Sequence, residues 1–133
     1  MQSFFGVYML PKKYRLKSTA AFNATYKNHN IISDDNVCIY LGREKKDASF
    51  DTRIAFIAGK KIHKRAVVRN RIKRLMRESI RLALKNNELN ALHKYLSVLC
   101  IAKSGSIGAS FADIDASMHR LLGGLSQHYI YFE

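Results

Sequence analysis

Short apolar runs separated by polar segments predict several strands in this chain. Val37 to Leu41 and Arg53 to Ala58 are rich in β-branched and aromatic residues, and a further short strand is expected around Asn30 to Ile32. The charged segment Gly42 to Thr52 suits a hairpin loop between the first two. Leu96 to Ala102 is almost continuously apolar, which is typical of a buried central strand.

Helical patterns flank these strands. Ser18 or Thr19 can cap a short helix that ends near Lys27. A long helix is expected from about Ala66 to at least Leu84, and a second helical stretch from Glu88 to Tyr95. The resulting interpretation is a small α+β sandwich of helices on a sheet.

The final helix is expected to begin at Ser110, which forms an approximate capping box with Asp113. Gly123 and Gly124 are expected to end it. Its predicted apolar face consists of Phe111, Ile114, Met118, Leu121 and Leu122.

The long helix is amphipathic on a wheel of about 100° per residue. Its apolar stripe, wide enough to dock on a sheet, comprises Val68, Ile72, Leu75, Met76, Ser79 and Ala83. The opposite side carries Arg69, Asn70, Lys73, Arg74, Arg77 and Arg81, with Arg71 at the border.

Charge is concentrated around this helix. The chain of 133 residues has a net charge of +13, and Lys60 to Arg81 alone holds ten cations and one acid, Glu78. Like charges at i,i+4 destabilise a helix, so a purely solvated basic face is a poor explanation. Glu78 is expected to moderate this repulsion rather than to lie near a metal ion.

Four of these ten cations, Lys60, Lys61, Lys64 and Arg65, precede the helix at the positive end of its macrodipole. A phosphate at this end would relieve both the repulsion between the cations and their unfavourable position at the positive end of the dipole. The pattern therefore predicts a polyanion site. A membrane-surface helix is disfavoured, because the apolar stripe is needed for the sheet and no Trp or lipidation signal accompanies it.

Aromatic residues favour RNA or single strands over duplex DNA. Phe22 and Tyr26 share a helix face, and Tyr40 shares a strand face with Cys38. If the two elements pack together, a ring-lined groove would lie beside the basic helix and could stack unpaired bases. Core packing of each ring is the alternative that the pattern leaves open.

Other chemistries find little support. Cys38 and Cys100 stand singly in apolar runs, which indicates buried reduced thiols and a cytoplasmic protein. The five histidines lack metal-ligand spacing, the ten acids form no cluster, and no secretory signal or membrane-spanning run is seen. We therefore expect no catalytic residue, no bound metal or cofactor and no small-molecule substrate.

The stretch Lys60-Lys61-Ile62-His63-Lys64-Arg65-Ala66-Val67-Val68-Arg69-Asn70-Arg71-Ile72-Lys73-Arg74 resembles the signature of the bacterial ribonuclease P protein subunit. Arg15-Leu16, Phe22 and Tyr26 are similar to that family's opening helix, and Val98 to Lys103 to its apolar strand with a following basic residue. The similarity implies a domain over residues 14–125, an N-terminal extension over 1–13 and a tail over 126–133.

The resemblance implies an α/β sandwich in the order α-β-β-β-α-β-α with a left-handed βαβ crossover. It implies a partner of the catalytic RNA that helps to remove the 5′ leader of precursor tRNA, with cleavage by the RNA and its magnesium ions. The protein alone would be inactive. The alternative is a free-standing RNA-binding or ribosome-associated module, and a third hypothesis is a protein-only nuclease.

Carried over by position, the RNA contacts would come from the basic helix and the loop before it. Together with the charge pattern, they comprise Lys60, Lys61, Lys64, Arg65, Arg69, Asn70, Arg71, Lys73, Arg74 and Arg77. A leader-binding cleft would be lined by Phe22, Tyr26, Cys38, Tyr40, Arg69 and Asn70. Departures from the family pattern occur at Cys38, often aliphatic, and at Ala58-Gly59, usually a hydrophobic residue and Ser.

Overall fold

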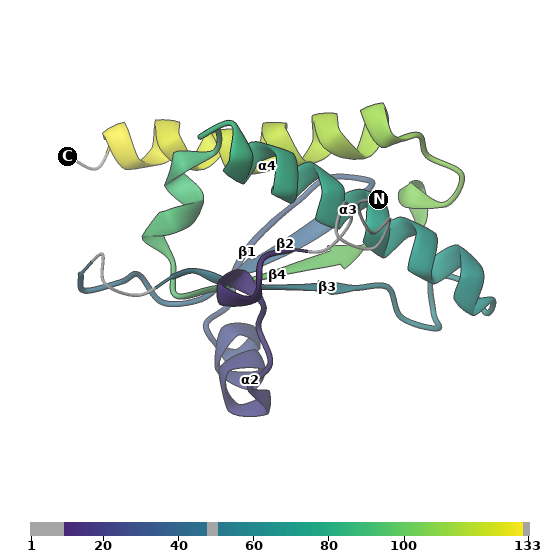
Figure 1. The fold of residues 1–133 in the computed structure, drawn as a ribbon, viewed down its shortest axis with the longest axis horizontal. Coiled ribbons are helices and arrows are strands. Elements are labelled where there is room, and N and C mark those ends of the chain that lie inside the picture. The colour runs from purple at the N-terminus through teal and green to yellow at the C-terminus, as the bar shows by residue number, and fades with distance from the viewer. Residues whose placement is uncertain (1–9, 48–50, 132–133) are drawn as a thin grey trace, which may run out of the picture.

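A four-stranded sheet in the order β1-β2-β4-β3 forms the middle of the fold (Figure 1). The strands are β1 (Asn30–Ser33), β2 (Val37–Leu41), β3 (Arg53–Ile57) and β4 (Ser97–Ala102). They are seen in a computed structural model that describes residues 10–47 and 51–131. All four predicted strands are confirmed, including the short first one.

β4 lies between β2 and β3, so the predicted hairpin across residues 42–52 is wrong. β4 pairs antiparallel with β2 and parallel with β3. Five of its six residues are buried, and an apolar strand of this kind gains most by an interior position. The parallel pair is joined through a helix, as the resemblance implies; the left hand of that crossover stays a prediction.

Three α-helices complete the fold: α2 (Thr19–Lys27), α3 (Ala66–Lys85) and α4 (Phe111–Tyr131). α3 and α4 lie on one side of the sheet and α2 on the other (Figure 1). Short 3-10 helices are η1 (Lys12–Tyr14), η2 (Asn90–Lys94) and η3 (Ser104–Ser106). The order α-β-β-β-α-β-α of the main elements is confirmed.

Two helix boundaries differ from prediction. The stretch from Glu88 to Tyr95 shortens to η2, because Leu89 adopts the left-handed region with φ of 55° and interrupts the helical backbone. α4 does not end at Gly123 and Gly124 but continues to Tyr131. Each glycine costs a helix about 1 kcal/mol, which burial of apolar neighbours such as Leu122 can offset.

The main core lies between the sheet and the pair α3 and α4. Alternate β4 residues Val98, Cys100 and Ala102 belong to it, while Leu99 is buried on the opposite face. α3 buries Ile72, Met76, Ser79, Ile80 and Ala83. Ile80 is absent from the predicted stripe, and the predicted Val68 and Leu75 are only partly buried.

The N-terminal segment reaches this core. Leu10 is 2% exposed, and its carbonyl accepts a 2.7 Å hydrogen bond from Nε of Arg15. Arg15 forms a parallel bridge with Ile54, which extends the outer edge of β3. Residues 1–9 of the predicted extension and 132–133 of the predicted tail lie outside the described residues.

The turn between β1 and β2 is tied to α4 through the Asp34 carboxylate. One carboxylate oxygen accepts from the backbone N–H groups of Asn36 and Val37 at 2.8 and 2.9 Å, and the other pairs with Arg120. Burial alone would raise the pKa of Asp34. Hydrogen bonds from Ser117, the two N–H groups and Arg120 outweigh burial and lower it to about 2.

Candidate nucleic-acid interface

The cationic face of α3 is open to solvent over its first three turns. Asn70, Arg71 and Arg74 are exposed, and Arg69 and Lys73 are partly buried. The apolar side of the helix docks on the core, which turns these side chains outward. Five of the predicted contacts therefore share one accessible surface.

The loop before α3 presents a second group of exposed cations: Lys60, Lys61, Lys64 and Arg65. The loop is braced by its own side chains, since Nδ1 of His63 accepts from the N–H of Arg65 at 3.0 Å. Nη1 of Arg69 donates to the carbonyls of His63 and Lys64 at 3.0 and 2.8 Å. Arg69, predicted as an RNA contact, thus also holds the loop in place.

Within the described part of the chain, no salt bridge engages the four loop cations or the helix residues 69, 71, 73, 74 and 77. Glu78 pairs with Arg81 at 2.6 Å, as expected of the one acid on the helix. Arg71 donates to the carbonyl of Ala109 at 3.1 Å. The protein's own carboxylates therefore leave the surface strongly positive.

Arg77 does not project to solvent opposite the apolar stripe, as the helical wheel predicted. It is partly buried, with its guanidinium carbon 5.6 Å from the ring centre of Phe56 on β3. Burial lowers the pKa of Arg77, and the charges of Arg15 and Arg74 lower it further. The wheel places residues around one helix but cannot show that a neighbouring strand covers its flank.

α2 is fixed to the open face of the sheet by a buried polar contact. Its N-cap is Ser18, whose hydroxyl accepts from the N–H of Ala21, as predicted. The hydroxyl of Thr25, 1% exposed, is hydrogen-bonded to the hydroxyl of Ser97 at the start of β4. Asn28 adds a 3.0 Å hydrogen bond to the carbonyl of Leu41.

This docking brings together the three predicted rings, which we call the aromatic patch: Phe22, Tyr26 and Tyr40. The ring centres of Phe22 and Tyr26 are 5.2 Å apart, and those of Tyr26 and Tyr40 are 4.8 Å apart. All three side chains are partly exposed, so none is a closed core residue. Burial raises the pKa of Tyr26, with Tyr40 and Cys38 adding to the effect, so its phenol stays neutral at physiological pH.

A strip of half-buried residues leads from the aromatic patch to the loop cations. Strand register places Cys38 beside Ile101 and Ile101 beside Ile57, all on the α2 face and only partly buried. Ile57 is three residues before Lys60, and Ile101 two residues before Lys103. We call the end of the sheet formed by the loop cations and Lys103 the cationic edge.

The two cysteines are both free thiols. Cys100 is buried, as predicted, and burial raises its pKa to about 12. Cys38 is only partly buried, contrary to the prediction of two buried thiols. Burial raises the pKa of Cys38, and the positive charge of Lys103 opposes the change.

Within residues 10–47 and 51–131, no group of three or more His, Cys, Asp or Glu side chains could hold a metal ion. In the same residues, no helix has the length and apolar character needed to cross a bilayer.

A cationic helix, a cationic edge and a partly exposed aromatic patch on one small sheet define a nucleic-acid-binding α/β protein. The chain belongs to the Ribonuclease P family, whose sequence model matches residues 10–126. The resemblance seen in the sequence is thereby confirmed.

Named relatives agree with this assignment. The "Ribonuclease P protein component" of Clostridium kluyveri is 34% identical over 109 residues, which cover 82% of this chain and 91% of that protein. The protein of the same name from Acidothermus cellulolyticus is 29% identical over 119 residues, covering 90% and 93%.

Solved structures confirm the fold. The RNase P protein of Staphylococcus aureus superposes with a TM-score of 0.65 at 23% identity, covering 83% of this chain and 93% of that one. The RNase P protein of Thermotoga maritima gives 0.63 at 18% identity, covering 81% and 94%. The mixed α+β sandwich is therefore shared with both.

Sequence reasoning did not select three side chains near these surfaces: His63, Phe56 and Lys103. Nothing in the local pattern singles out His63, whose role depends on the path of the loop. Phe56 meets Arg77 only through tertiary packing. Lys103 could have been found from its position directly after the central strand, level with the basic loop that follows β3.

Proposed function

We propose that this protein is the RNA-binding subunit of ribonuclease P, which assists the catalytic RNA in removing the 5′ leader of precursor tRNA. The observation that carries the proposal is the set of cations on the first three turns of α3 and on the cationic edge, which the described carboxylates leave unpaired. Chemistry belongs to the RNA subunit and the magnesium ions that it holds. The protein contributes binding and is inactive alone.

The cationic face of α3 and the loop before it contact RNA phosphates. Each Lys or Arg that neutralises a phosphate releases counterions, so binding weakens as salt rises, with a slope of roughly 0.7 to 0.9 log units per contact. The free N–H groups at the start of α3 favour the same ligand, since its N-cap residue Arg65 makes no side-chain cap.

The aromatic patch binds unpaired bases of the leader. Each base that stacks on a Tyr or Phe ring gains roughly 1–3 kcal/mol, without strong dependence on base identity. The strip of Cys38, Ile101 and Ile57 gives the leader a path from these rings to the cationic edge. Arg69 and Asn70 contact the leader RNA where that path reaches α3.

The test is cleavage of precursor tRNA by the catalytic RNA at limiting magnesium, with and without this protein. We expect the protein to restore cleavage, and the gain to increase with leader length. Stimulation of cleavage that does not depend on leader length would refute leader binding. No stimulation at any protein concentration would favour the free-standing RNA-binding module, and cleavage without added RNA would favour a protein-only nuclease.

Variants then locate the surfaces. Arg74→Gln is preferred to an Arg69 variant, because Arg74 is exposed whereas Arg69 also braces the loop. We expect Arg74→Gln to weaken RNA binding and to lower the salt slope, whereas Lys85→Gln, an equal loss of charge at the other end of α3, changes neither. Tyr26→Ala should impair long-leader substrates and leave leaderless tRNA nearly unchanged; equal losses would indicate damage to the fold.

A further inference from the structure

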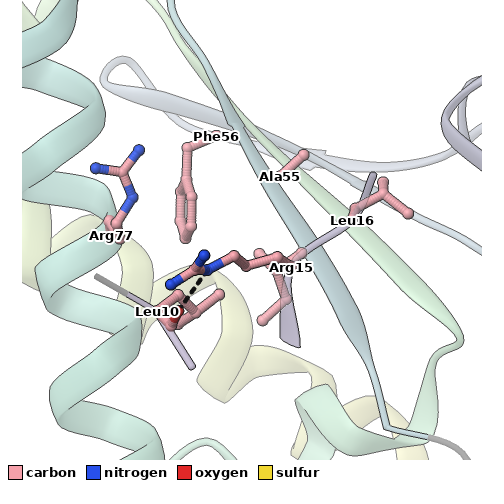
Figure 2. A pocket seen from close by; sticks show the side chains of 7 residues that line it. Leu10, Arg15, Leu16, Ala55, Phe56 and Arg77 are labelled. Atoms are coloured by element: carbon pink, nitrogen blue, oxygen red, sulfur yellow. Dashed lines mark hydrogen bonds between the residues drawn. The ribbon is translucent and has the colours of Figure 1, made fainter. Parts of the chain in front are cut away.

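A pocket of about 420 Å³ opens on the outer side of β3, where the N-terminal segment crosses beside α3 (Figure 2). Its lining comprises Leu10, Arg15, Leu16, Ile54, Ala55, Phe56 and Arg77. The volume falls within the roughly 300–1,000 Å³ typical of ligand sites. Neither the aromatic patch nor the cationic edge contributes a residue to it.

Two guanidinium groups reach the pocket from different elements. Arg77 comes from α3, whereas Arg15 comes from the segment that bridges Ile54 at the edge of the sheet. Figure 2 shows both heads beside the ring of Phe56, with Arg15 held through its Nε by the carbonyl of Leu10. This bond fixes the direction of Arg15 and leaves its two Nη groups for another acceptor.

Charge in the pocket is uncompensated by the protein. None of the lining residues is acidic, and no salt bridge of the described residues includes Arg15 or Arg77. The two cations repel each other and are partly withdrawn from water, as the lowered pKa of Arg77 records. An anion between them would reverse both effects, and two planar guanidiniums suit the oxygens of a phosphate.

We propose that Arg15 and Arg77 form a phosphodiester-binding pocket for an RNA strand that runs along the outer edge of β3. The ligand follows from the RNA-binding function proposed above, because a polyanion is the partner that the rest of the surface fits. The apolar side of the pocket, Leu16 and Phe56, faces the ribose next to that phosphate. The site adjoins the cationic face of α3, because Arg77 lies three residues after Arg74 and four after Lys73 on the same helix.

The first experiment uses the unmodified protein and inorganic phosphate as the probe. Side-chain Nε–H resonances of the arginines are followed by NMR during the titration. We expect those of Arg15 and Arg77 to shift together with one saturation curve. Two arginines that shift independently, or not at all, would overturn a shared site.

The second experiment identifies the source of the phosphate. Arg15→Gln and Arg77→Gln are compared with Lys17→Gln and Lys85→Gln, exposed positions that remove the same charge. Binding to the catalytic RNA is measured as a function of salt. We expect each pocket variant to lower the slope by about 0.7 to 0.9 log units and the double variant to add little, because both groups hold one phosphate. Unchanged slopes alongside a positive phosphate titration would show a free-anion site and overturn the RNA proposal.

Failure of the pocket proposal can be distinguished from failure of the RNA-binding function proposed above. If Arg74→Gln weakens RNA binding while both pocket variants behave as their controls, the pocket proposal fails and the RNA-binding role stands. If Arg74→Gln also has no effect, the RNA-binding role itself fails. Arg77→Lys, which keeps the charge without the planar fork, is expected to retain most of the salt slope but to bind the RNA more weakly than the unmodified protein.

Discussion

The buried hydroxyl pair of Thr25 and Ser97 is expected to hold α2, and with it the aromatic patch, on the sheet. The Thr25 hydroxyl donates to the carbonyl of Ala21 at 2.7 Å, so its hydrogen is used and Ser97 must donate to Thr25. Thr25→Val keeps the shape of the side chain but leaves the Ser97 O–H without its acceptor. Ser97 is 8% exposed, so water cannot readily replace the lost partner.

A buried donor left without an acceptor lowers the free energy of unfolding by about 1–3 kcal/mol. Removing the donor itself loses only the hydrogen bond, about 0.5–1.5 kcal/mol. We therefore expect Thr25→Val to lower the free energy of unfolding by about 2 kcal/mol and Ser97→Ala by about 1 kcal/mol. The double variant leaves no buried donor without an acceptor. It should lose about 1 to 2 kcal/mol, less than the two single losses combined.

Urea unfolding of the unmodified protein, the two single variants and the double variant measures these free energies. Thr25→Ser, which keeps the hydroxyl, is the control in which the hydrogen bonds to Ala21 and Ser97 are retained. The gain in cleavage from a long leader is measured in parallel and should fall with Thr25→Val. Strict additivity of the single variants would refute the assignment of α2 docking to this pair. So would a Thr25→Val protein with unchanged stability.

Two further predictions concern titration and reactivity. Since the pKa of Asp34 is lowered to about 2 from 3.8, its contribution is present above pH 4 and is lost as pH falls toward 2. The free energy of unfolding is measured by urea unfolding at a series of pH values. Asp34→Asn should reduce its loss between pH 4 and pH 2 by about 1–2 kcal/mol, and an unchanged pH profile would contradict the carboxylate's role. For the thiols, a thiol reagent should modify Cys38 in the native protein and Cys100 only after unfolding, counted by mass spectrometry. Bound leader RNA should protect Cys38, and equal labelling with and without RNA would place the leader elsewhere.

Local patterns in the sequence were sufficient for the order of the main helices and strands and for the exposed cations of α3. The apolar and cationic sides of α3 depend only on helical spacing, so Ile72 and Met76 are buried and Arg74 is exposed as predicted. The capping box of α4 is equally local, with Ser110 and Asp113 in reciprocal hydrogen bonds. The signature of the basic loop and helix also identified the family.

The tertiary structure alone decided what lies between elements distant in the chain. The position of β4 between β2 and β3 follows from competition among strands for the interior, which no single strand's pattern records. Arg15, Phe56 and Arg77 meet because three separate segments converge on one edge of the sheet. A periodicity describes the neighbours of a residue within its own element, and the partners that complete a pocket come from outside it.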